Sequence, residues 1–267
     1  MRVLGGWFGR LSPQGHPESS TAKKPVAGRS EEESFLADSI HWQATETVEP
    51  GGGASDDESG AAALLTFGYA DPSAEGLARQ LMAKFPEADT AYCWLGHHYG
   101  LRGRFDEARA VLDEGLAACA RKRRLCREYG RLELEACRLP EAVKWWLRAA
   151  TLQARGNSLD DHEPFLFLAY VAGCCGLADQ ARQLFAIVDR IQPARLSPAG
   201  QAELHTLVDQ TTRRPLVKAI EAFVQSRHFS LLTTGCAPGS MHYDKRIESA
   251  KAPTERVGGD GLPRESG

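Results

Sequence analysis

Three arginines spaced by three and four residues are the side chains in this sequence best suited to binding chemistry. They are Arg124, Arg127 and Arg131. In an α-helix this spacing places all three guanidinium groups on one face. Planar guanidinium groups donate paired hydrogen bonds to carboxylates, so the stripe predicts binding of an acidic peptide or a chain terminus. The alternative is an ordinary solvated helix face, which the adjacent basic residues also fit: Arg121, Lys122 and Arg123.

Two cysteine and histidine groups have a spacing that metal ligands can use. Cys93 and His97 are four residues apart, and Cys174 and Cys175 are adjacent. The alternative for each group is structural, because buried cysteines behave as small hydrophobic residues. None of the seven cysteines forms the paired CxxC spacing of a zinc site. We therefore expect no metal and no cofactor.

The common catalytic motifs are missing from the sequence. It contains no GxxxxGK[ST] phosphate loop, no GxSxG nucleophile elbow and no HExxH zinc motif. The glycine run at 51–53 fits a linker. Trp145 and Trp146 are adjacent on a helix and point in different directions, so at most Trp145 is available to a ligand. The sequence predicts a protein that is not an enzyme.

Composition limits the class of protein and its partners. Of the 267 residues, 42% are hydrophobic and 25% are charged, which is ordinary for a folded globular protein. The net charge of -3 gives no basic surface for nucleic acid. The longest apolar stretch, 61–70, is too short to cross a bilayer, and the apolar stretch at 3–8 is too short for a secretory signal. We expect a cytoplasmic protein with no membrane span.

Apolar spacing divides the chain into a folded centre and two tails. Residues 1–54 and 229–267 are rich in Gly, Ser, Pro and charged residues, which predicts flexible tails. From about residue 61 to 228, apolar residues recur every three or four positions, and no segment alternates with period two. The sequence therefore predicts an all-α fold.

The helical centre carries a repeat of 34 residues. Ala142 and Trp146 stand 34 residues after Ala108 and Leu112. A third copy, which ends at Pro193, follows an insertion of five residues. Small residues in this pattern allow two helices to approach closely, and large apolar residues fill the space around them. The residues of the pattern are Tyr92, Leu95, Gly96, Tyr99, Ala108, Leu112, Ala142, Trp146, Ala181, Phe185 and Pro193.

This pattern resembles the tetratricopeptide repeat. The resemblance covers residues 55–195 as four units: a degenerate unit at 55–88, then 89–122, 123–156 and 162–195. Gly103 and Gly176 fit the tight turns inside units. Residues 196–228 are expected to form capping helices, with Ser197 as N-cap, Pro198 at the first helical position and a break at Pro215.

The resemblance implies a stacked α-α solenoid in which the first helix of each unit lines a concave groove that binds a peptide or helix. The groove would contain Arg124, Arg127 and Arg131, with His97 and Cys93 before them and Tyr170 after them. The implied function is a protein-binding adaptor or assembly scaffold. The alternatives are a chaperone for a secreted or assembling partner and a regulatory subunit of an enzyme. Leu64, Leu65 and Phe67 of the leading unit are a candidate surface for self-association.

Overall fold

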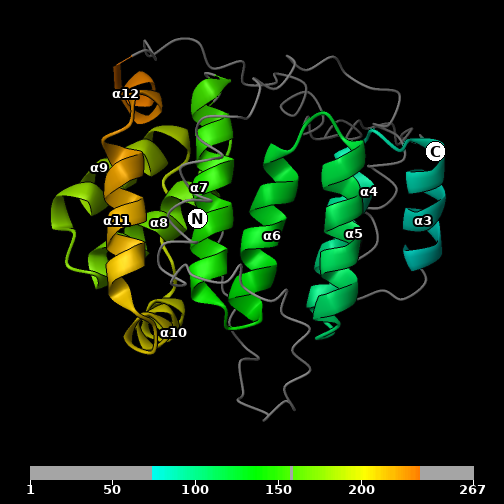
Figure 1. Ribbon diagram of the computed structural model, residues 1–267, viewed down its shortest axis with the longest axis horizontal. Helices are drawn as coiled ribbons and strands as arrows, with labels where there is room; N and C mark the ends of the chain where they lie inside the picture. The colour runs from blue at the N-terminus through cyan, green and yellow to red at the C-terminus, as the bar shows by residue number, and fades with distance from the viewer. Residues whose placement is uncertain (1–73, 157–158, 235–267) are drawn as a thin grey trace, which may run out of the picture. The chain divides into compact units, whose positions relative to one another are not determined.

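A computed structural model describes residues 74–156 and 159–234, and within these stretches the chain is entirely helical (Figure 1). The predicted all-α class is confirmed for this part. The expected tail at 1–54 and the part of the expected tail 229–267 beyond residue 234 lie outside it, as do Leu64, Leu65 and Phe67. The predicted start of the second tail is wrong, because residues 229–234 belong to a helix in which Phe229 and Leu232 are buried. The ten helices of the described residues are α3 (Ala74–Lys84), α4 (Asp89–Gly100), α5 (Phe105–Ala118), α6 (Arg123–Glu135), α7 (Leu139–Arg155), α8 (Glu163–Cys174), α9 (Ala178–Ile191), α10 (Pro198–Asp209), α11 (Arg213–Val224) and α12 (Arg227–Thr234).

Three consecutive helix pairs, α4–α5, α6–α7 and α8–α9, are joined by the same turn. In the first pair the amide of Arg104 donates to the carbonyl of Tyr99 at 3.0 Å, and the other two pairs repeat this bond. The turn requires one residue with positive φ, and Gly103 (71°) and Gly176 (81°) supply it as predicted. In the middle pair the same place is taken by Cys137, with φ of 59°. That side chain therefore carries the steric cost that glycine avoids.

Small residues bring the two helices of a pair together, as the repeat pattern predicts. A Cβ on Gly96 of α4 would lie 2.8 Å from the Leu112 side chain of α5. At the equivalent place in the next pair, a Cβ on Gly130 of α6 would overlap the indole of Trp146 on α7. Trp146 is fully buried and stacks on Phe167 of α8 with ring centroids 4.4 Å apart, so the indole has no space into which to move.

Gly130→Ala is expected to lower the free energy of unfolding by about 1–3 kcal/mol, because the added methyl must displace a rigid buried indole. Gly173→Ala in α8 is the matched control. It also removes a helical glycine, but a Cβ there meets nothing within 4 Å. This control should gain about 0.5–1 kcal/mol from the better helix propensity of alanine. Urea denaturation measures the free energy of unfolding of both variants, and equal changes in the two would contradict the packing argument.

Apolar side chains gather in two large clusters along the chain. One lies among α3, α4, α5 and α6 and includes Tyr92, Trp94 and Tyr99. The other begins with Leu134 of α6, runs through α7 to α12 and includes Phe165 and Phe223. Figure 1 shows α5, α6 and α7 side by side, and α6 packs against both of its neighbours. α6 therefore connects the two apolar clusters.

The helices after α9 pack back on the central ones. α10 contacts α8, α11 contacts α7, α8 and α9, and α12 contacts α7. The expected cap at the start of α10 is present, since the Ser197 hydroxyl accepts a hydrogen bond from the Gly200 amide at 3.1 Å. The expected break at Pro215 is wrong. The chain turns at 210–212, and Pro215 is the third residue of α11, where its missing N–H costs no helical hydrogen bond.

Two positions of the repeat differ from the predicted packing. Phe185 was expected in the core but is only partly buried, and its ring meets Tyr170 edge-on at 5.1 Å, while Leu184 takes the fully buried place. Glu133, which stands where the first unit has Tyr99, is buried and pairs with Arg109 of α5 at 2.8 Å. The guanidinium of Arg109 allows a carboxylate to occupy a core position.

Candidate functional site

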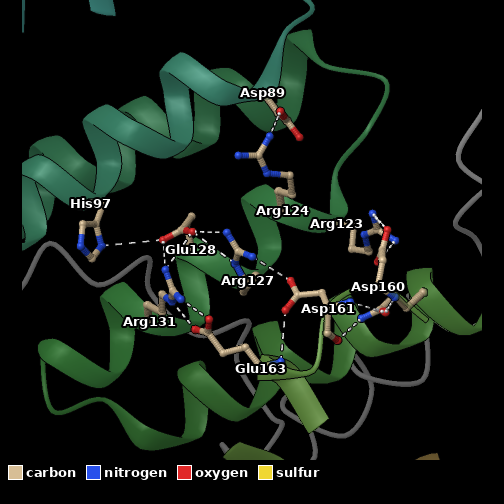
Figure 2. Close-up of polar contacts among 11 residues, drawn as sticks. Asp89, His97, Arg123, Arg124, Arg127, Glu128, Arg131, Asp160, Asp161 and Glu163 are labelled. Carbon is tan, nitrogen blue, oxygen red and sulfur yellow. Dashed lines mark hydrogen bonds and ion pairs between the residues drawn. The ribbon is translucent and has the colours of Figure 1, made fainter. Parts of the chain in front are cut away.

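The three arginines of α6 lie on the side of that helix that meets α4 and the start of α8 (Figure 2). Leu125 and Cys126 are fully buried on the other side. The helical spacing that predicted one basic face is therefore confirmed. Each of the three guanidinium groups already contacts at least one carboxylate of the chain, which the sequence analysis did not predict.

The ion pairs join three segments that are distant in the sequence. Arg124 contacts Asp89 of α4 at 2.9 Å, and its side chain remains 42% exposed. Arg127 contacts Asp161 at 2.9 Å and also contacts Glu128. Arg131 contacts Glu128 at 3.1 Å and forms a two-pronged pair with Glu163 of α8. We call Arg127, Glu128, Arg131, Asp161 and Glu163 the ionic cluster.

A single glutamine holds the loop that supplies part of this cluster. The buried Gln153 of α7 donates from its amide nitrogen to the Asp161 carbonyl at 2.7 Å. Its side-chain oxygen accepts from the amides of Asp160 and Asp161, each at 3.2 Å. Asp161 in turn accepts a hydrogen bond at 3.1 Å from the amide of Glu163, the first residue of α8. The extra loop before the third unit therefore positions the acids that face α6.

Glu128 is the central group of the cluster. Its side chain is only 6% exposed, and burial by itself would raise its pKa. Arg131 and Arg127 outweigh that effect and hold the pKa of Glu128 at about 2. The carboxylate is therefore ionised at any physiological pH, and two guanidinium groups of its own helix compensate for its removal from water.

Two further residues of the predicted groove are not free to bind a partner. Nδ1 of His97 lies 3.8 Å from Glu128, but burial lowers the pKa of His97 to about 4, so the ring is neutral near pH 7. Cys93, which was expected on an exposed face, is buried instead. Burial raises the pKa of its thiol well above the ordinary value, so a thiolate is disfavoured. The cause is the close approach of α4 to α6, which encloses both side chains.

Tyr170 lies apart from the ionic cluster. Its hydroxyl accepts a hydrogen bond from the Leu196 amide at 3.3 Å, and its ring packs on Phe185. Trp145 is also engaged, because its ring stacks on Tyr129 with centroids 4.1 Å apart and lies next to Arg148. Of the six predicted groove residues, the structure therefore brings His97 and the three arginines close to one another. Cys93 is buried behind them, and Tyr170 lies elsewhere.

Around the arginines, carboxylates outnumber guanidinium groups. Arg123 also lies here and pairs with Asp160 at 2.8 Å. Five carboxylates therefore face four guanidinium groups: Asp89, Glu128, Asp160, Asp161 and Glu163 against Arg123, Arg124, Arg127 and Arg131. An acidic peptide would have to displace the carboxylates of the chain itself. The sequence contained one signal of this arrangement, the Glu128–Arg131 spacing of three on one helix.

Glu135, one turn beyond Arg131 on α6, is a functional candidate that sequence reasoning missed. A Cβ on Gly100 of α4 would lie 2.9 Å from its Oε2, so the carboxyl rests against the α4 backbone. The pKa of Glu135 is raised to about 7, mainly by burial and also by Glu128, against the opposing effect of Arg131. Among the described residues no cation or hydrogen-bond donor pairs with it. Nothing in the sequence distinguishes this glutamate from its neighbours.

No group of three His, Cys, Asp or Glu side chains in 74–156 and 159–234 has an arrangement that could hold a metal ion. None of the helices described there is long and apolar enough to cross a bilayer.

Comparison with known proteins gave no relative. No protein-family model matches the chain, and no curated protein or solved structure matches it significantly.

Arg131→Met is expected to lower the free energy of unfolding by about 3–5 kcal/mol, because it leaves Glu128 and Glu163 buried with less compensation. Arg124→Met is the matched control on the same helix, where the partly exposed pair should contribute less than about 1 kcal/mol. Adding Glu163→Gln to Arg131→Met should recover part of the loss. Urea denaturation measures all three, and similar losses for Arg131→Met and Arg124→Met would refute the central place of the cluster.

Glu135→Gln is expected to stabilise the protein increasingly as the pH rises. The pKa of Glu135 in the folded chain is about 7 against an ordinary 4.5, so folding favours the protonated form. Its contribution to stability is present below pH 4.5 and is lost as the pH rises through 7. Above that pH, the free energy of unfolding of the variant should therefore exceed that of the wild type by about 1–3 kcal/mol, and the difference should be smaller at acidic pH. Urea titrations at a series of pH values measure this difference, and a difference that does not change with pH would contradict the burial of this carboxyl.

Proposed function

We propose that this chain is a non-enzymatic protein-binding module built from tetratricopeptide-like repeats, in which a partner segment lies along α4, α6 and α8, the first helices of the three helix pairs. One observation carries the proposal: three consecutive helix pairs share the same positive-φ turn. The first two pairs also share the same glycine contact between their helices. Repeated pairs of this kind bury their apolar faces by stacking, and on α6 Arg124 keeps substantial solvent access.

The ion pairs of the α6 arginines support a binding role because they fix the first helices relative to one another. Arg124 joins α6 to α4, and Arg131 joins α6 to α8. A surface whose side chains are already held in place loses less conformational entropy when a partner binds. The same pairing indicates which residues a partner can reach. Arg127 and Arg131 are occupied by carboxylates of the chain, whereas Arg124 keeps substantial solvent access.

Site-specific photo-crosslinking in cells of the source organism tests the proposal without knowledge of the partner. A photo-reactive phenylalanine derivative replaces Arg124 on α6, and in a matched protein it replaces Arg182, an exposed residue of the second helix α9. Both positions lie at surface ion pairs, so neither replacement should cost more than about 1 kcal/mol of stability.

The expected result is a discrete protein adduct from position 124 and none from position 182. Adducts of the same mass and yield from both positions would indicate nonspecific contact, and adducts from neither would indicate that the first helices bind no protein. Either result contradicts the proposed function. Circular dichroism spectra of the two proteins must match for the comparison to be valid.

A further inference from the structure

Glu135 occupies the place where the C-terminal ends of two helices meet. It is the last residue of α6, and its carboxyl lies against Gly100, the last residue of α4. The C-terminal end of each helix carries about half a negative charge from its aligned peptide dipoles. A carboxylate at this point adds negative charge to a region that is already negative and partly shielded from water. Either a proton, which the raised pKa of Glu135 favours, or a cation from a partner would remove this charge.

The basic residues at this end of the two helix pairs are directed to other groups. Arg102 contacts His98 at 2.9 Å. Arg104 pairs with Glu75 and Glu107, and Arg138 pairs with Glu133. Arg131 is the nearest cation on α6, but its guanidinium is engaged by Glu128 and Glu163. Glu135 has no ion pair or hydrogen bond in the described part of the chain.

An exposed apolar residue directly follows Gly100, against which this carboxyl lies. Leu101, which follows Gly100, is 46% exposed and is one of the two large hydrophobic residues among those described that are exposed to this degree. Lysine and arginine combine a cationic head with an aliphatic stem that favours apolar surface. The Glu135 carboxyl could pair with the head of such a side chain, and the exposed leucine that follows Gly100 offers apolar surface for its stem. A single carboxylate is too few ligands for a metal ion but is sufficient for an ammonium or guanidinium group.

We propose that Glu135 receives a lysine or arginine side chain of the protein partner, whose stem lies on Leu101 and whose head pairs with the carboxylate between α4 and α6. This inference rests on the proposed function and specifies the chemistry of the partner. It replaces the expected acidic segment with a basic one, because the arginines are satisfied by the chain's own carboxylates and Glu135 is not.

A random-peptide display library selected on the purified full-length chain at neutral pH provides the probe. The dissociation constant of the best selected peptide is then measured for the wild type, Glu135→Gln, Gly100→Ala and the control Glu114→Gln, which removes an exposed carboxylate on α5. Gly100→Ala keeps every charge but pushes against the Glu135 carboxyl. Replacing each lysine or arginine of the peptide by norleucine completes a double-mutant cycle with Glu135.

The expected result is a selected peptide with a lysine or arginine that couples to Glu135. Binding should weaken about tenfold or more in Glu135→Gln, weaken in Gly100→Ala and remain unchanged in Glu114→Gln. The norleucine peptide should bind wild type and Glu135→Gln equally. Because Glu135→Gln is expected to be more stable than the wild type, loss of binding in this variant is not a folding defect.

Two results would overturn the inference, and they separate it from the proposed function. Selected peptides that lack basic residues, or that bind Glu135→Gln as tightly as the wild type, refute the role of Glu135 and leave the binding module intact. Failure of the full-length chain to enrich any peptide refutes both. Carbon-detected NMR titration of the free chain adds a third check. A Glu135 pKa below its ordinary 4.5 would mean that a cation of the chain itself already occupies the place.

Discussion

Glu128 is almost fully removed from water and yet remains ionised, because Arg127 and Arg131 on the same helix approach it closely. A buried carboxylate without such partners would take up a proton or prevent the helices from approaching. Once the charge is compensated, the two arginines can extend to Asp161 and Glu163. The contacts of α6 with α8 and with the loop before it therefore depend on a charge balance in addition to apolar packing, and loss of Arg127 or Arg131 would weaken them.

That balance also decides what the surface can bind. A stripe of arginines attracts an acidic partner only when the guanidinium groups are free, and here they are engaged by acids from α4, from the loop before α8 and from α8 itself. The carboxyl group that remains without an ion pair is that of Glu135, one helical turn beyond Arg131. A carboxylate next to two helix C-termini favours a cation, and it selects against acidic segments by repulsion. The specificity of the proposed binding surface therefore comes from the charge left uncompensated by the ionic cluster.

The three helix pairs are built with the same local geometry. The same turn occurs three times, and glycine supplies the positive φ in two of them while Cys137 tolerates it in the third. Close contacts at Gly96 and Gly130 set the distance between the helices of the first two pairs. The helices after α9 then pack on α7 and α8. A buried Glu133 opposite Arg109 shows that the pattern accepts a charge in a core position when a cation from the neighbouring helix accompanies it.

The sequence by itself determined the helical class, the positions of the three helix pairs and the common face of the three arginines. Those features follow from local spacing: apolar residues every three or four positions, a period of 34 residues, and glycines where a turn needs positive φ. The tertiary structure alone decided which acids meet the arginines, because Asp89, Asp161 and Glu163 reach α6 only through the stacking of helices and the loop held by Gln153. It also singled out Glu135, since the absence of a partner depends on where every nearby cation points in space, and side-chain spacing along one helix contains no such information.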